Sequence, residues 1–186
     1  MPSASTTGRL LVATPVINDP NFDRTVVLML QHDETDGAVG IVINRPTETE
    51  VVDVLPEWGG LVGAPTVVFA GGPVSVESAI ALGGTAGATS PPGWTRVVHD
   101  IGTVDLELPF DQVGPHVSAA RLYAGYAGWG PGQLEGEIEV GAWFVVDALP
   151  GDALTDAPHE LWSAVLRRQP DNRSWFANYP VDPSFN

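Results

Sequence analysis

A hairpin of two almost wholly apolar strands is the feature that most constrains how this chain can fold. The segment 24–32 is rich in Val, Leu and Met, and the segment 38–44 returns as a second apolar run. Between them, Asp36-Gly37 is a dipeptide typical of tight hairpin turns. Strands that are apolar at successive positions, rather than at alternate ones, are buried on both faces. The sequence therefore predicts a sheet that other elements cover on both sides.

Further strands are predicted along the chain, and they neighbour one another more often than they alternate with helices. The expected strands are 9–14, 65–70, 78–82, a hairpin within 94–108, 120–127 and 142–148, and the expected short helices are 48–58, 112–119, 133–138 and 159–168. The tail 169–186 carries three aromatic residues and is expected to pack back onto the body. This order favours an α+β fold, either a mostly antiparallel curved sheet or a small closed β-barrel, flanked by short helices.

Length and composition are those of one globular domain. The chain has 186 residues, of which 44% are hydrophobic and 17% charged, and no linker or internal repeat divides it. We therefore predict a single domain over residues 1–186. No run of about 18 apolar residues predicts a membrane span, and the segment 1–7 lacks the features of a signal peptide. A cytoplasmic protein is expected, and the absence of cysteine agrees with that expectation.

The charge balance argues against direct binding of nucleic acid. All eight basic residues are Arg, there is no Lys, and 23 acidic residues bring the net charge to −15. Affinity for a phosphate backbone comes from clustered Lys and Arg, and this chain has no such cluster. Direct DNA binding is therefore the least favoured function.

The sequence contains none of the common catalytic or nucleotide-binding motifs. A phosphate loop that requires Lys is impossible, and the glycine spacing of a dinucleotide fold and the serine elbow of a hydrolase are absent. The four His residues lack metal-ligand spacing, so neither a metal nor a cofactor is expected. Glu135 and Glu137 would point apart on a helix, which disfavours a pair of catalytic carboxylates. A non-enzymatic protein is favoured, while an unrecognised enzyme stays an alternative.

The segment 121–137 is the most unusual stretch of the chain. Five glycines lie between positions 125 and 136, among two large aromatic residues. Gly130 is expected to cap a helix whose first residue is Pro131, and the free N–H groups at that start could hold an anion. This segment and three other turns supply the candidate binding residues: Asn21, Phe22, Arg24, Asn44, Arg45, Gly71, Gly72, Tyr126, Trp129 and Gln133. All four clusters also fit tight turns in which Gly and Asn relieve backbone strain.

Several ordered motifs make the sequence resemble the YqgE/AlgH family of bacterial proteins over nearly the whole chain. They are 11–15, 19–26, His32, 37–46, 71–74, 141–143, 161–162 and, most specifically, Gly125-Tyr126-Ala127-Gly128-Trp129-Gly130-Pro131-Gly132-Gln133-Leu134-Glu135. Gln31 and Val39 stand where many members have Glu and Met. The resemblance implies an α+β fold with a small closed β-barrel. Members are commonly labelled transcriptional regulators, without an established reaction, ligand or cofactor.

Three functional hypotheses follow. The first is a non-enzymatic cytoplasmic regulator or adaptor that binds an unidentified protein partner through an exposed face containing Tyr126, Trp129 and an Arg. The second is a protein that binds a small anionic ligand at Arg24 or Arg45, or an unrecognised enzyme. The third is direct nucleic-acid binding. If the two aromatic side chains are buried with their polar atoms satisfied, the first loses its anchor, whereas a concave pocket containing an Arg favours the second. The sequence does not determine the oligomeric state.

Overall fold

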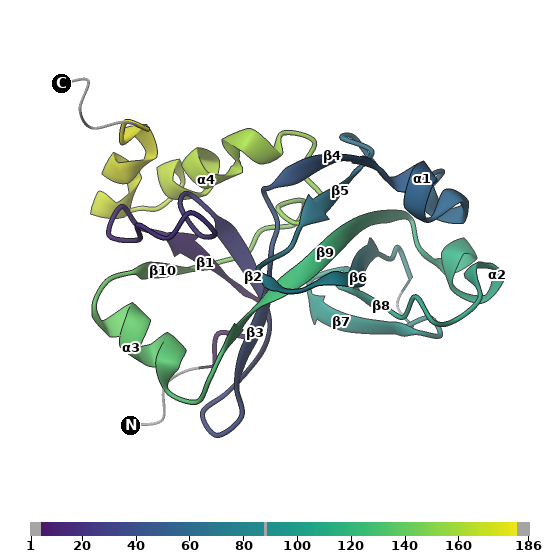
Figure 1. Ribbon diagram of the computed structural model, residues 1–186, viewed down its shortest axis with the longest axis horizontal. Helices are drawn as coiled ribbons and strands as arrows, with labels where there is room; N and C mark the ends of the chain where they lie inside the picture. Colours follow the sequence, from purple (N-terminus) through teal and green to yellow (C-terminus); the bar gives the residue numbers. More distant parts are fainter. Residues whose placement is uncertain (1–4, 88, 182–186) are drawn as a thin grey trace.

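The predicted 24–44 hairpin lies at the centre of one half of a curled, mostly antiparallel sheet. A computed structural model of the chain describes residues 5–87 and 89–181 (Figure 1). Within those residues the strands are β1 (Arg9–Ala13), β2 (Val26–Asp33), β3 (Gly37–Val42), β4 (Pro46–Glu50), β5 (Val67–Ala70), β6 (Val74–Gly84), β7 (Trp94–Val98), β8 (Ile101–Val104), β9 (Ala119–Trp129) and β10 (Trp143–Asp147). Short helices flank them: α1 (Val51–Val54), α2 (Phe110–Val113), α3 (Gln133–Glu139) and α4 (Pro158–Arg167), with 3-10 turns η1 (Pro56–Trp58), η2 (Gly114–His116) and η3 (Asn172–Asn178).

The sheet is open, so it forms a half-barrel. Its strand order is β10-β1-β2-β3-β9-β6-β8-β7, and β4 and β5 join at β9 off this path. Among the described residues, β10 pairs only with β1 and β7 pairs only with β8. The α+β fold with a curved sheet is therefore confirmed, and of the two predicted forms the open one is found.

Strand β9 connects the two halves of the sheet. Its C-terminal part pairs with β3, and its N-terminal part pairs with β6 and, in parallel, with β5 (Figure 1). The two parts meet at Gly125, whose φ of 73° is in the region that favours glycine. A Cβ on Gly125 would lie 2.5 Å from the Gly72 carbonyl oxygen. The glycines of this signature segment therefore allow one strand to bend and to cross another at close range.

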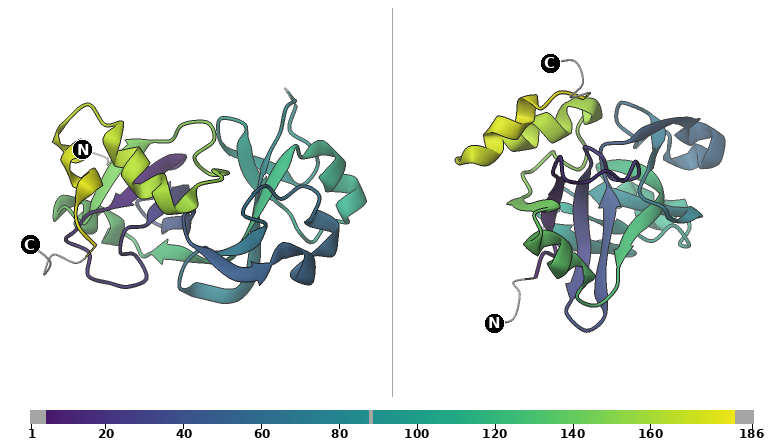
Figure 2. Two further views of the ribbon diagram at one scale, coloured as in Figure 1. Left: turned by 90° about the horizontal axis from the view of Figure 1, so that it is seen from above. Right: turned by 60° about the vertical axis from the view of Figure 1, so that its left-hand side comes forward.

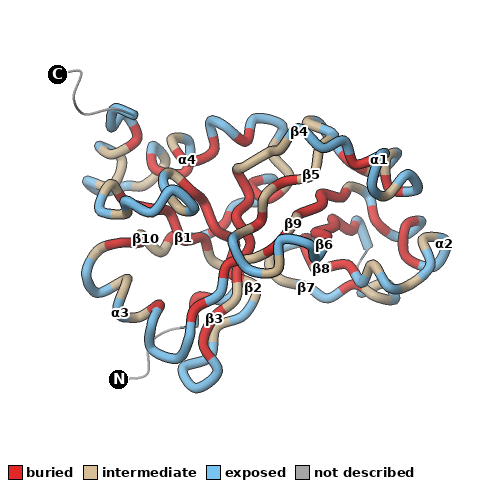
Figure 3. The backbone as a smooth tube through the Cα atoms, viewed as in Figure 1, coloured by how far each residue is buried: buried red, intermediate tan, exposed pale blue. Residues whose placement is uncertain are grey.

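Both faces of the predicted hairpin are buried, as expected. Val26 and Leu28 of β2 belong to a core that α4 covers, whereas Val27 and Met29 belong to a core on the opposite face. A third core fills the half that contains β6, β7 and β8. In Figure 3 the central strands are buried along most of their length, and the hairpin tip and the outer loops are exposed.

The helices differ from the prediction mainly at their ends. The expected 48–58 helix is the end of β4 followed by two single turns, because Pro56 cannot continue α1. The expected 112–119 helix ends at His116, where the chain extends into β9. The expected 78–82 strand extends further than predicted, since Gly83 and Gly84 belong to β6 and pair with β8. The described part of the tail, residues 169–181, packs back as expected: η3 lies beside α4, and Phe176 contacts Phe144 with ring centroids 5.5 Å apart (Figure 2). The rest of the predicted tail, 182–186, lies outside the described residues.

None of the helices in the described part of the chain is both long and apolar enough to span a membrane.

Candidate ligand-binding site

The loop between β1 and β2, residues 14–25, carries the first group of predicted site residues. Two side chains from the end of β3 hold it in place. Asn44 is buried, accepts a hydrogen bond from the Val26 backbone N–H at 2.9 Å and donates one to the Arg24 carbonyl at 2.9 Å. Arg45 donates to the carbonyls of Pro20 at 2.8 Å and Asp23 at 2.7 Å. Desolvation lowers the pKa of Arg45, but an arginine stays charged at neutral pH.

The two hydrogen bonds of the Asn44 side chain, called the Asn44 clamp below, make this residue important for stability. Replacing Asn44 with alanine should lower the free energy of unfolding by about 2 kcal/mol, since the Val26 N–H and the Arg24 carbonyl both lose their partner. Urea denaturation followed by circular dichroism measures the change. Asn18→Ala is the control, because Asn18 is exposed on the same loop and should change stability by less than about 0.5 kcal/mol. Equal losses in the two variants would contradict the clamp.

Arg24 has a strained backbone beside a cavity. Its φ is 52°, a conformation that costs a non-glycine residue roughly 1–3 kcal/mol and that is concentrated at functional sites. Its guanidinium carbon lies 4.6 Å from the ring centroid of Trp162, a cation–π contact. The indole N–H of Trp162 donates to the Ala13 carbonyl at 2.9 Å. The Asn44 clamp and the Trp162 ring therefore fix both the backbone and the side chain of Arg24.

The cavity beside Arg24 has a volume of about 410 Å³, within the usual range for ligand pockets. Thr14 and Asn18 add polar groups to its wall, and the segment 179–181 forms one side. The guanidinium donates a hydrogen bond to the Tyr179 carbonyl in that segment. The Asp23 carboxylate also lines the cavity, so the cavity is not uniformly positive.

Three aromatic rings pack together on the other side of the same loop. Phe22 lies 5.6 Å from Trp143 and 6.2 Å from Trp129, and the two indole rings lie 6.0 Å apart at 79°. Both indole N–H groups donate to one carboxylate oxygen of Glu137, at 2.9 Å from Trp129 and 2.8 Å from Trp143. Gln133 donates to the other oxygen at 3.0 Å. Glu137 therefore accepts a hydrogen bond from each of the two indole N–H groups in the cluster.

The position of Trp129 corrects one expectation. Only 6% of it is exposed, and its N–H is satisfied, so it is not part of an exposed aromatic face. Tyr126 is partly exposed, and it pairs with Val74 on β6, away from the Phe22 cluster. Gly71 and Gly72 lie where β5 crosses β9: a Cβ on Gly72 would be 2.2 Å from the Tyr126 carbonyl carbon. The structure thus brings seven of the ten predicted residues onto or against the 14–25 loop. Tyr126 pairs with β6 instead, and Gly71 and Gly72 contact the backbone of β3 and β9.

The predicted helix start is also corrected. Gly132, with φ of 74°, precedes α3, which begins at Gln133 as the predicted range 133–138 has it, so the cap at Gly130 and the first helical residue at Pro131 are wrong. The Gly130 N–H, expected to be free for an anion, is 3.1 Å from the Gln133 side-chain oxygen. With seven residues, α3 is short, and we assign no anion site to its start.

A buried network at His32 has no signal in the sequence, because its members are far apart in the chain. Nε2 of His32 lies 2.9 Å from Glu135 Oε1, and Nδ1 lies 3.2 Å from the Thr6 N–H and 3.1 Å from the Thr6 hydroxyl. The Thr6 N–H makes Nδ1 an acceptor, so Nε2 carries the proton and donates to Glu135. A backbone N–H and then His32 lower the pKa of Glu135. The order hydroxyl–imidazole–carboxylate is that of a nucleophilic triad. Thr6, however, is only 4% exposed, so the network joins the N-terminal segment to α3.

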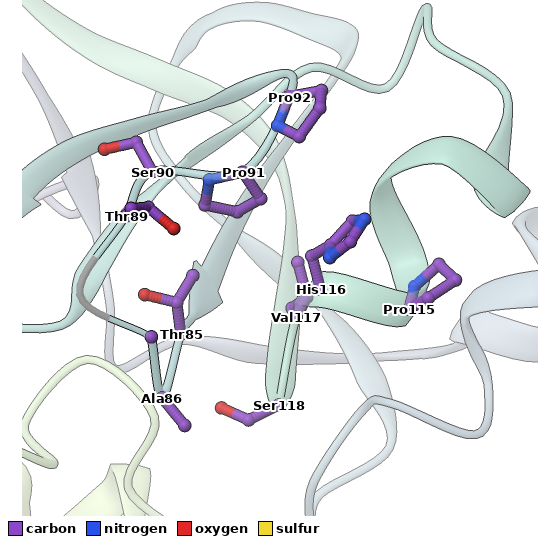
Figure 4. Close-up of a pocket in the computed structure, with 11 residues that line it drawn as sticks. Thr85, Ala86, Thr89, Ser90, Pro91, Pro92, Pro115, His116, Val117 and Ser118 are labelled. Atoms are coloured by element: carbon purple, nitrogen blue, oxygen red, sulfur yellow. The ribbon is translucent and has the colours of Figure 1, made fainter.

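Another cavity, of about 450 Å³, is lined by residues 85–87 and 89–92 on one side and by residues 115–118 on the other (Figure 4). Hydroxyl groups and prolines line most of it, with the His116 imidazole on one side. Figure 4 shows His116 and Ser118 pointing in different directions, and the Ser118 hydroxyl donates to the Gly84 carbonyl at 3.1 Å. These two groups therefore form no nucleophile–base pair. No cluster of three or more His, Asp or Glu side chains within residues 5–87 and 89–181 could hold a metal ion.

A family model described as AlgH-like matches residues 10–174. The chain belongs to the AlgH-like family. A UPF0301 protein of Streptomyces coelicolor is 54% identical, with 98% of this chain and 96% of the relative covered, and one of Thermobifida fusca is 42% identical, with 100% and 98% covered.

Two solved structures show the same fold. A crystal structure of a protein from Corynebacterium diphtheriae matches with a TM-score of 0.87 and 33% identity, covering 95% of this chain and 93% of that one. The solution structure of the AlgH protein from Pseudomonas aeruginosa matches with a TM-score of 0.70 and 27% identity, covering 98% and 100%. Their descriptions state no reaction or ligand, so the function of the AlgH-like chain has to be argued from its own site.

Proposed function

We propose that this AlgH-like protein is a non-enzymatic cytoplasmic regulator or adaptor that responds to a small anionic ligand bound at Arg24. The observation that carries the proposal is a rigidly held guanidinium beside a cavity of about 410 Å³. The planar guanidinium matches the geometry of a carboxylate or phosphate and keeps its charge at any physiological pH. Among the described residues its hydrogen bond goes to the Tyr179 carbonyl, and a guanidinium has five N–H donors.

The arrangement around Arg24 supports a binding site more than a structural role. Asn44 and Arg45 hold the loop at its backbone, so the Arg24 side chain is not needed for that purpose. The strained φ of Arg24 is maintained although glycine would relieve it. Trp162 orients the guanidinium, which reduces the entropy lost when a ligand binds.

The alternatives have less support. An adaptor surface centred on Trp129 lacks an accessible indole, because Trp129 is buried. An enzyme would need an accessible nucleophile or acid–base pair, and the His32 network offers a buried hydroxyl. Direct nucleic-acid binding is opposed by the net charge of −15.

Thermal and urea unfolding with sodium phosphate, citrate and adenosine monophosphate as probes test the proposal. A ligand that binds the native state at 100 times its dissociation constant should stabilise the wild type by about 2.7 kcal/mol. Arg24→Met should remove this effect. Arg9→Met is the matched control, because Arg9 forms an exposed ion pair with Asp147 away from the cavity, and it should respond like the wild type. If every anion leaves the wild type unchanged, or stabilises Arg24→Met equally, the proposal is wrong.

A further inference from the structure

A further groove lies away from Arg24 and contains none of the predicted site residues. Its volume is about 700 Å³, and its walls come from the start of β4, from the turn before β5 and from the start of α4. Strand β4 and α4 lie along the same side of the molecule (Figures 1 and 2). Much of the lining is apolar, including Pro46, Pro65, Val67 and Pro158. Ligand and peptide grooves typically have this size and apolar lining.

The charged groups exposed in the groove have one sign. Glu48, Asp156 and Glu160 line it and are exposed, the exposed imidazole of His159 lies beside them, and no arginine is among the lining residues. Arg121 is buried next to the groove, where its guanidinium donates to the carbonyls of Ala64 and Thr155. A ligand in the groove therefore meets three carboxylates on an apolar surface.

The same bonds of Arg121 fix the width of the groove. Ala64 precedes the wall residue Pro65, and Thr155 precedes the wall residue Asp156. The two bonds, 3.0 Å to Ala64 and 2.8 Å to Thr155, connect the wall formed by the turn before β5 to the wall formed by the segment before α4. The groove is therefore formed before any ligand binds, which lowers the entropic cost of binding.

One wall of the groove is an edge strand. Strand β4 pairs with β5, and no strand among the described residues pairs with its other edge. Edge strands bind extended peptides, with side chains at alternate positions facing the receptor. The β4 edge is incomplete as a donor, since Pro46 has no N–H and the Thr49 N–H is 3.2 Å from the Thr47 hydroxyl. Side-chain charge and apolar contact therefore have to supply most of the affinity.

We propose that this groove binds an extended segment of a partner protein in which apolar residues alternate with Lys or Arg. The apolar side chains contact the proline-rich floor, and the basic side chains face Glu48, Asp156 and Glu160. The groove thus gives the proposed regulator a partner surface separate from its Arg24 cavity. The two proposals can be tested separately, because Arg24→Met should leave binding of the peptide to the groove unchanged.

Fluorescence anisotropy with a labelled Val-Lys-Val-Lys-Val-Lys peptide tests the groove. The triple variant Glu48→Gln/Asp156→Asn/Glu160→Gln should bind at least tenfold more weakly than the wild type, and binding should weaken as salt screens the charges. The matched control is Glu57→Gln/Glu107→Gln/Glu139→Gln, which removes the same three charges from exposed positions elsewhere and should lose less than twofold. Equal losses in both triple variants, or equal binding of a Val-Glu-Val-Glu-Val-Glu peptide, would overturn the proposal.

NMR mapping on the folded wild type locates the peptide. Amide shift changes confined to the non-proline residues of 46–48, 64–67 and 156–160 would support the groove, and changes elsewhere would refute it. Ala157→Trp, which places a large side chain at an exposed lining position, should block binding while the rest of the spectrum is retained. Sedimentation velocity tests whether a second copy of the chain occupies the groove instead. That occupant would be assigned if the wild type self-associates, if Ala157→Trp abolishes the self-association, and if the peptide fails to inhibit it.

Discussion

Replacing Arg121 with alanine should lower the free energy of unfolding by roughly 3–5 kcal/mol, the scale measured when a large buried side chain is truncated to alanine. Arg121 is 1% exposed, although no carboxylate of the described residues is bonded to it. Its NH1 group lies 2.8 Å from the Thr155 carbonyl and 3.5 Å from that of Ala153, and its NH2 group lies 3.0 Å from the Ala64 carbonyl. Alanine would remove the guanidinium donor from the Thr155 and Ala64 oxygens and would leave a cavity beside the Phe69 ring.

The surroundings of Arg121 explain how a charge is tolerated there. The guanidinium carbon lies 4.4 Å from the Phe69 ring centroid, and the neighbouring Tyr123 is fully buried with its hydroxyl donating to Ala153. Burial lowers the pKa of Arg121, an effect that Tyr123 and Asp156 partly oppose. Burial raises the pKa of Tyr123. Arg121 therefore joins β9 to the chain segments on both sides of it through backbone carbonyls.

Urea denaturation of two further variants tests this account. Arg121→Met refills much of the volume and should lose less than the alanine variant, because only the carbonyl partners are missing. Arg167→Ala, at an exposed position of α4, should change the free energy of unfolding by less than about 0.5 kcal/mol. A loss below about 1 kcal/mol in Arg121→Ala would contradict the assigned role.

The burial of Arg121 also shows why part of the structure could not be predicted from sequence. Arginine is rarely buried, so its place at the start of the 121–137 segment carries no signal of a central position. The 24–44 hairpin was predictable, because its turn and its apolar runs are local features. The choice between an open and a closed sheet was not, because it depends on which distant strands pair. Strand β10 meets β1 across more than a hundred residues, and no pattern in either strand specifies that pairing.

The candidate site was predictable to a similar extent. Residues at the ends of neighbouring strands, such as Arg24 and Asn44, were expected near one another, and the structure places them in contact. Trp162 gave only the signal of an amphipathic helix, so its contact with Arg24 could not be inferred. The cap of α3 was predicted at Gly130, but Gly132 takes the left-handed conformation before the helix. Either glycine could adopt that conformation, so the residue type does not distinguish them. Glycines mark flexible positions without showing which of them the fold uses.

Trp129→Ala should lower the free energy of unfolding by roughly 3–5 kcal/mol, as expected when a buried tryptophan is truncated. Trp129 packs against Trp143 and Phe22, and its N–H is one of three donors to Glu137. Its loss therefore opens a cavity and removes support from the loop that carries Arg24. A binding assay with Trp129→Ala alone would confuse a damaged fold with a lost contact.

The matched comparison for Trp129 is Trp175, which is 80% exposed on η3. Trp175→Ala should change the free energy of unfolding by less than about 0.5 kcal/mol, because the exposed Trp175 ring buries little surface in the folded protein. Glu137→Leu separates packing from hydrogen bonding: it keeps the three rings but leaves two buried indole N–H groups without an acceptor, at a cost of about 1–3 kcal/mol each. A stable Trp129→Ala variant would mean that the ring is a dispensable surface group, and the partner surface originally expected at Trp129 would have to be reconsidered.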